Sequence, residues 1–184
     1  GGTEMGQGVY SNIAAIAARE LGLTMDRIRV MATRTDKVPN TSATAASCGT
    51  DLNGAAVKDA CDKLRVRLQR FAEKMLREKC GRAVSADQVV FNANMVLHVE
   101  EPSLGVTFAE LLQRAYFART SLSATGFYRT PEIQYDRETG RGKPFHYFAV
   151  GAAVGEGEVD GETGRMRWSG VEMWRGVGRR IETG

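Results

Sequence analysis

The chain has 184 residues and a net charge of only +3, so its size suits one ordinary domain and its charge does not indicate nucleic-acid binding. Hydrophobic residues make up 42% and charged residues 26%, a globular balance that excludes collagen-like, low-complexity and disordered classes. No apolar run reaches the ~18 residues of a membrane helix, and no signal segment opens the chain. Its three widely spaced cysteines favour reduced thiols in the cytoplasm over disulfides or a zinc site.

The first half of the chain predicts two helices with a strand and a loop between them. Apolar residues recur at helical spacing over residues 9–22, and a glycine ends that stretch. Apolar and polar residues alternate over residues 28–33, which predicts a half-buried strand. Residues 36–43 hold Pro, Asn, Thr and Ser and predict a loop. A long helix is then predicted from about Asn53 to Lys79.

The second half predicts shorter elements. Three stretches are strand candidates: residues 89–91, 95–99 and 145–160. Residues 107–110 read Thr-Phe-Ala-Glu, a capping box, and predict a helix to about Arg119. Residues 120–144 show little periodicity, and residues 160–164 predict a turn. No repeat or Pro- or Ser-rich linker divides the chain, so the elements together predict one α+β unit of mixed helices and strands.

Positive charge is concentrated in residues 63–82, which hold eight basic and two acidic residues. Four apolar residues recur there at helical spacing: Leu64, Leu68, Phe71 and Met75. The basic residues then fall on or beside the opposite face, which predicts a solvated helix surface. The alternative is a surface for an acidic partner, and nucleic acid as that partner would require steeply salt-dependent binding.

Two segments rich in small residues precede predicted helices. The glycine loop, residues 1–8, reads Gly-Gly-Thr-Glu-Met-Gly-Gln-Gly, and glycine lets backbone N–H groups approach a ligand closely. The small-residue segment, residues 39–54, leaves its backbone uncovered before the long helix. Helix N-termini supply unpaired N–H donors that suit anions. The glycine loop has neither a Walker A pattern nor a GxGxxG after a strand, so a plain tight loop remains equally open.

Four segments, in the expected order, resemble the molybdopterin-binding domain of the molybdenum hydroxylases. They are the glycine loop, VPNTSATAAS at 38–47, LSATGFYRTP at 122–131 and PFHYF at 144–148. The last two resemble the xanthine dehydrogenase branch of this family more than the aldehyde oxidase branch. The resemblance implies part of an α+β cofactor-binding domain in a cytoplasmic oxidoreductase of purine metabolism. Its implied reaction is hydroxylation of hypoxanthine or xanthine, with oxygen from water.

The resemblance also implies a molybdenum–molybdopterin cofactor, in its plain or dinucleotide form. The residues that it assigns to cofactor contact are Met5, Gly6, Gln7, Ala45, Ala46, Ser47, Gly49 and Thr50. Ala46 is expected nearest the metal, which the pterin dithiolene and no side chain would ligate. FAD and iron–sulfur clusters are expected in other domains or subunits, alongside the rest of the catalytic subunit. No nucleic-acid or membrane partner is expected.

The resemblance covers residues 1–164. Residues 165–184 change abruptly to Arg, Gly and Trp and are predicted to be a divergent tail, with out-of-frame translation as the hypothesis for its origin. The family's catalytic Glu and substrate-clamping residues have no counterpart here, so no catalytic residue is assigned and the chain alone is expected to be inactive. Without an initiator Met, the chain is expected to be a fragment. A non-catalytic module that binds an anion or a nucleotide is the alternative.

Overall fold

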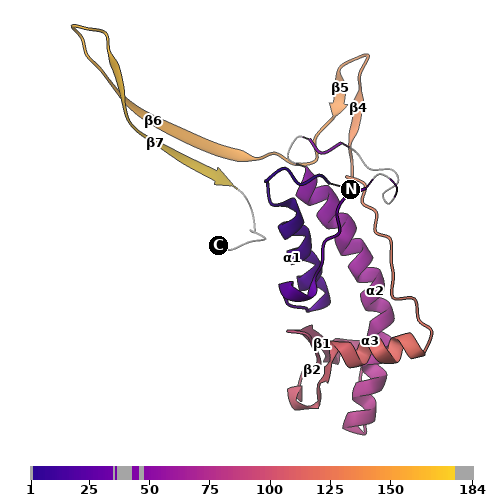
Figure 1. Cartoon of the computed structure of the whole chain (residues 1–184). Helices are drawn as coiled ribbons and strands as arrows, with labels where there is room; N and C mark the ends of the chain where they lie inside the picture. The colour runs from indigo at the N-terminus through magenta and orange to yellow at the C-terminus, as the bar shows by residue number, and fades with distance from the viewer. Residues whose placement is uncertain (1, 35, 37–42, 46–47, 177–184) are drawn as a thin grey trace. The chain divides into compact units, whose positions relative to one another are not determined.

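The structure, a computed structural model, describes residues 2–34, 36, 43–45 and 48–176. The chain forms two compact units, Gly1–Arg129 and Thr130–Gly184, each described below by itself. Among the described residues, every strand pairs only with strands of its own unit (Figure 1). The division between the units follows Arg129, within the stretch predicted to be irregular. The sequence instead predicted one α+β unit over residues 1–164, followed by a divergent tail. No described helix is both long and apolar enough to cross a membrane.

Two long helices dominate the first unit. Helix α1 spans Val9–Leu21 and helix α2 spans Gly49–Cys80, and they pack along each other (Figure 1). Both predicted helices are confirmed, and α2 begins four residues earlier than predicted. Gly22 ends α1 in the left-handed conformation, with φ of 66°, and a Cβ there would overlap the backbone of Phe91. Glycine is therefore required both by the turn and by the close approach of the sheet.

A three-stranded antiparallel sheet packs against α2 and α3. Its strands, in spatial order, are β1 (Val89–Asn92), β2 (Met95–His98) and β3 (Val106–Thr107), and α3 spans Phe108–Phe117. Three short 3₁₀ turns complete this unit: Met25–Arg27, Ala86–Gln88 and Pro102–Leu104. The core combines residues of both helices with the sheet: Leu68, Ala72, Met75, Leu76, Val84, Val89, Phe91, Val96, Val106, Phe108, Leu111 and Ala115. Both strands predicted here are confirmed.

The capping box predicted at the start of α3 is present. Thr107 Oγ1 accepts a hydrogen bond from the Glu110 N–H at 3.2 Å, and the Glu110 carboxylate accepts one from the Thr107 N–H at 2.7 Å. These reciprocal bonds satisfy donors that a helix start leaves unpaired.

The strand predicted at residues 28–33 is wrong. Ile28 and Val30 are half-buried as the alternation required, but Ala32 is exposed, and no described strand pairs with this segment. Its end is held instead by side-chain bonds, because Thr33 Oγ1 donates to the Gly2 carbonyl at 3.0 Å and lies 2.7 Å from the Tyr10 hydroxyl. Alternating apolar and polar residues indicate that a segment is half-buried, but a β-strand also requires backbone hydrogen bonds to a neighbouring strand.

The apolar stripe predicted on α2 is confirmed, and part of its basic face binds the chain itself. Arg67 donates to the carbonyl oxygens of Ser121 and Ser123 at 3.0 and 2.8 Å, and Lys63 donates to that of Thr125 at 3.1 Å. The N–H of Phe127 donates to Asp59 on the same helix at 2.9 Å. Residues 121–127 therefore lie along α2 as an extended segment, which we call the α2 strap. Other basic residues of α2, such as Arg70 and Lys74, are exposed as predicted.

The second unit consists of two antiparallel hairpins. Strands β4 (Gln134–Asp136) and β5 (Arg141–Lys143) form the short one, which the sequence did not predict. Strands β6 (Val150–Val159) and β7 (Met166–Gly176) form the long one, joined by the turn predicted at 160–164. The Asp160 carboxylate closes that turn by accepting the N–H groups of Glu162 and Thr163 at 2.9 and 3.0 Å. Most of the predicted divergent tail thus lies in β7.

The long hairpin contains a β-bulge. Glu156 pairs with Gly170 and Gly157 pairs with Trp168, so the register leaves Ser169 without a partner. Paired residues of antiparallel strands share a face. Four pairs lie on one largely apolar face: Ala153 with Met173, Gly155 with Val171, Gly157 with Trp168, and Val159 with Met166.

Candidate functional site

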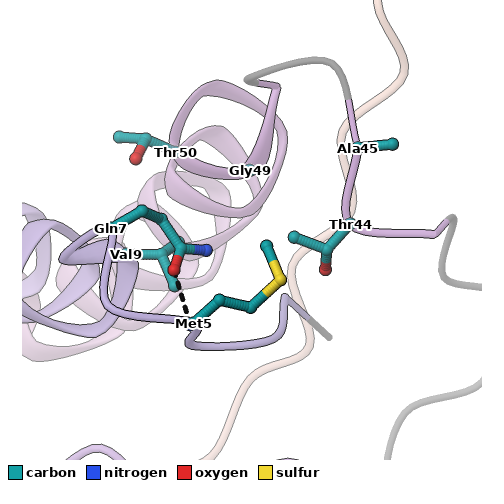
Figure 2. Close-up of a pocket in the computed structure, with 7 residues that line it drawn as sticks. All are labelled: Met5, Gln7, Val9, Thr44, Ala45, Gly49 and Thr50. Atoms are coloured by element: carbon teal, nitrogen blue, oxygen red, sulfur yellow. Dashed lines mark hydrogen bonds between the residues drawn. The ribbon is translucent and has the colours of Figure 1, made fainter.

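The glycine loop and the small-residue segment meet at one cavity of about 350 Å³, shown in Figure 2. Seven of the residues that the structure describes line it: Met5, Gln7, Val9, Thr44, Ala45, Gly49 and Thr50. Of the eight residues assigned from the sequence, the structure thus brings five together here: Met5, Gln7, Ala45, Gly49 and Thr50. Gly6 lies in the same turn but outside the lining. Ala46 and Ser47 lie outside the described residues.

The side chain of Glu4 organises the glycine loop. Its carboxylate accepts the backbone N–H groups of Gly6 at 2.8 Å, Gly8 at 3.1 Å and Tyr10 at 3.0 Å. These bonds, led by that from Tyr10, lower the pKa of Glu4 below its ordinary 4.5. Gly8 adopts a left-handed conformation and supplies no side chain, so Glu4 is what caps the start of α1. Sequence reasoning missed this role, although an acidic residue shortly before a helix was its signal.

Gln7 closes the loop on itself. Its Nε2 donates to the Thr3 carbonyl at 2.7 Å, and its Oε1 accepts the Met5 N–H at 2.6 Å, the bond drawn in Figure 2. The amide therefore holds the turn that displays Met5 to the cavity. Direct contact of Gln7 with a cofactor stays a prediction, and in this conformation both ends of the amide bond to the loop.

The start of α2 forms the opposite wall of the cavity. Cys48 precedes the helix, and both its N–H and its thiol donate to the Ala45 carbonyl, at 3.3 and 2.8 Å. Cys48 makes no side-chain cap bond to the helix start within the described part of the chain. Gly49 and Thr50 follow in the first turn, where backbone N–H groups point out of a helix and carry its partial positive charge.

Two side-chain hydrogen bonds hold the cavity walls together. Thr44 Oγ1 accepts the Thr3 N–H at 2.9 Å, which joins the two segments directly. Asn12 Nδ2 donates to Thr50 Oγ1 at 3.1 Å, which joins the first turns of α1 and α2. Segments some forty residues apart in the sequence are thus fixed on either side of one cavity.

The chemistry of this lining suits an uncharged or anionic polar ligand. Its described lining residues present backbone groups, two threonine hydroxyls, an amide and a thioether, and none of them has an ionisable side chain. N–H donors at a helix start and hydroxyls are typical partners of phosphate oxygens. Within the described ranges, no group of three His, Cys, Asp or Glu could hold a metal ion, so these residues offer no metal centre of their own.

Comparison with known sequences extends over almost the whole chain. A family model described as the molybdopterin cofactor-binding domain matches residues 1–183. Xanthine dehydrogenase/oxidase of Felis catus is 40% identical over 164 residues, covering 89% of this chain and 10% of the relative. Xanthine dehydrogenase of Oryza sativa subsp. japonica is 36% identical over 181 residues, covering 98% of this chain and 11% of the relative. The chain therefore spans about a tenth of the length of these curated relatives.

Solved structures share the fold. A reconstituted CO dehydrogenase from Oligotropha carboxidovorans matches with a TM-score of 0.75 and 24% identity, over 98% of this chain and 21% of its own. Quinoline 2-oxidoreductase from Pseudomonas putida 86 matches with a TM-score of 0.70 and 23% identity, over 92% and 20%. At such identities the likeness shows the fold alone, and it confirms the predicted mixed α+β architecture. The family match and the rice relative continue past residue 164, while the boundary predicted there stays a prediction.

Proposed function

This chain belongs to the molybdopterin cofactor-binding domain family of the molybdenum hydroxylases, and from that premise we propose that its 350 Å³ cavity holds the pterin cofactor. One observation carries the proposal. The two segments that the resemblance assigned to the cofactor, far apart in the sequence, line the same cavity and are hydrogen-bonded across it. Its donors suit a phosphate, and its short side chains leave room for a flat heterocycle, so the residues fit the group.

The proposed roles follow the two walls. The first turn of α2, at Gly49 and Thr50, would bind the phosphate through backbone N–H groups and a hydroxyl. The turn of Met5, Gly6 and Gln7 would border the pterin from the other wall. The remaining assigned contacts are Ala45, Ala46 and Ser47, of which Ala46 would lie nearest the metal. When bound, the molybdenum centre supplies the redox chemistry of a hydroxylation that takes its oxygen from water.

The proposed substrate is a purine, hypoxanthine or xanthine. This proposal is supported by the 36–40% identity to xanthine dehydrogenases. The similarity to CO dehydrogenase and quinoline 2-oxidoreductase, at 24% and 23% identity, shows a shared fold and gives no information on the substrate. An aldehyde oxidase-like hydroxylase is the alternative within the family. Partner domains or subunits would supply FAD, iron–sulfur clusters and the catalytic base, so the chain alone would be inactive. The whole enzyme would work in the cytoplasm.

Cofactor loading tests the proposal. The full chain is produced in a host that makes molybdopterin, and molybdenum and pterin are measured by elemental mass spectrometry and by pterin fluorescence. We expect about one of each per chain. Ala45→Phe should abolish loading because the ring fills the cavity, whereas Ala153→Phe, on an exposed strand, should not. A wild-type chain that takes up nucleotide or phosphate but no molybdenum would instead support the anion-binding module.

The substrate is tested after loading, with partner subunits added. Hypoxanthine, xanthine, an aldehyde and quinoline are compared by the hydroxylated product formed. Turnover of the purines but not the aldehyde supports the xanthine dehydrogenase branch. Turnover of the aldehyde in preference to the purines would transfer the chain to the alternative branch.

A further inference from the structure

We propose that Glu4 is a positioning residue for the cavity: its carboxylate shapes the Met5–Gln7 turn and accepts the N–H groups of Gly8 and Tyr10 at the start of α1, so that an anion binds at the start of α2. This inference rests on the proposed function for its ligand, but the geometry behind it belongs to the chain alone. Both helices begin at this cavity or beside it, and each would offer an anion the same kind of donor.

The two helix starts differ in what already occupies them. At α1, the N–H groups of Gly8 and Tyr10 donate to Glu4, with Gly6 as the third donor in the preceding turn. Charge-assisted bonds of this kind are stronger than neutral ones. A negative charge at this helix end also matches the positive end of the α1 dipole. An anionic ligand at α1 would therefore have to displace a carboxylate that makes three bonds.

At α2 the corresponding positions face the cavity. The only acidic residue of its first turn is Asp51, and its Oδ1 accepts the N–H of the following residue, Leu52, at 2.9 Å. Gly49 and Thr50, the two residues directly before Asp51, line the cavity wall. Glu4 thus accepts donors at the start of α1, while Gly49 and Thr50 at the start of α2 line the cavity in which the ligand is proposed to bind.

Glu4 also sets the shape of the facing wall. Gly6 has a φ of 97° and Gly8 a φ of 78°, and the carboxylate holds the turn between them through their N–H groups. Gln7, between the two glycines, and Met5, directly before Gly6, both border the cavity. Removing the carboxylate should therefore loosen the wall without touching the ligand directly, which is how a positioning residue differs from a binding one.

Glu4→Gln tests the proposal, with Asp160→Asn as the matched control. Asp160 also accepts two backbone N–H groups in a turn, but in the second unit. In the cofactor-free full chain, hydrogen exchange is read residue by residue by NMR. Glu4→Gln should speed exchange at Gly6, Gly8 and Tyr10 by about tenfold or more, because a neutral amide replaces the charged acceptor. The control should leave these amides unchanged.

Inorganic phosphate provides the second readout. In the wild-type chain, phosphate should shift the amide signals of Gly49 and Thr50 and not those of α1. In Glu4→Gln it should also shift Gly8 and Tyr10, because their donors become available. Glu4→Asp keeps the charge with a shorter reach, so it should keep phosphate away from α1 even if its exchange rates rise. A merely structural role would not redirect the anion in this way.

Cofactor retention completes the test. The Glu4→Gln chain should lose pterin and molybdenum at least tenfold faster than wild type, and Asp160→Asn should not. Unchanged exchange in Glu4→Gln, phosphate shifts at α1 in the wild type, or wild-type retention by Glu4→Gln would each overturn the proposal. If the wild type takes up no molybdenum while the exchange and phosphate results hold, the proposed function fails and the role of Glu4 in directing anions stands.

Discussion

Replacing Gly126 with alanine tests how tightly the α2 strap is seated on α2. A Cβ at residue 126 would overlap the carbonyl oxygen of Ala56 and lie 2.8 Å from the backbone N of Ala60. Both atoms belong to the backbone of a 32-residue helix, which cannot bend away locally as a flexible side chain would. The strap must therefore lift, and its bonds to Arg67 and Lys63 must lengthen or break.

The size of the effect follows from the kind of overlap. Forcing an extra carbon into a packed site costs typically 1–3 kcal/mol, and a clash with immovable backbone belongs near the upper end, about 2–3 kcal/mol. For a chain of this size, each kcal/mol shifts the melting temperature by roughly 2–4 °C. Gly126→Ala should therefore lower the melting temperature by roughly 4–12 °C.

Thermal unfolding followed by circular dichroism measures this shift. Gly161→Ala is the matched control, because a Cβ there meets no atom within 4 Å. A double-mutant cycle with Arg67→Ala adds a second check: once the strap has lifted, removing Arg67 should cost less than it does in the wild type. Melting temperatures within 1 °C of each other for the two glycine variants would refute this account of the strap.

Three further predictions concern the cavity and the capping box. Thr44→Val should reduce cofactor retention several-fold with little change in melting temperature, because it breaks the bond to the Thr3 N–H that joins the cavity walls. Thr44→Ser keeps the hydroxyl and should retain the cofactor. Equal loss of cofactor in both variants would contradict the role of that bond. Thr107→Ala should destabilise the chain by about 1 kcal/mol, the usual value of an N-cap, in a chemical denaturation experiment in which Thr107→Ser stays near wild type. Hydrogen bonds from the Thr107 side chain and backbone lower the pKa of Glu110, so its contribution to stability is present above the ordinary value of 4.5 and is lost as the pH falls through the lower folded value. Glu110→Gln should flatten that acid limb of the stability profile, and an unchanged limb would show that Glu110 does not contribute to it.

Local sequence signals were sufficient where one short pattern fixes one element. The capping box at Thr107, the glycine after α1 and the apolar stripe of α2 each act through neighbours in the chain, so their consequences could be predicted. The strand expected at 28–33 and the hairpin of β4 and β5 depended on partners that the local pattern does not specify. The extended strap also escaped prediction, since its carbonyls are satisfied by α2 side chains some sixty residues away.

The candidate site divides in the same way. A helix start behind small residues is visible in the sequence, and the structure places Gly49 and Thr50 of that start in the cavity lining, whereas their contact with a ligand stays a prediction. That two such starts share one cavity followed from the family resemblance and not from spacing, because the bonds of Thr44 and Asn12 across it are tertiary. Glu4 was visible only as one acidic residue in a glycine-rich loop, and its three N–H partners appear once the loop is folded.

The unpaired Ser169 is a residue that the long hairpin can lose without any change in its two faces. Trp168 and Trp174 are six positions apart and would share a face in an unbroken strand, but the bulge between them sends them to opposite faces. Deleting Ser169 would leave the two tryptophans five positions apart in a regular strand, with Gly170 still paired to Glu156 and Trp168 to Gly157, so both would keep their present faces. A one-residue deletion in β6, where every residue is paired, would instead turn the residues beyond it to the opposite face.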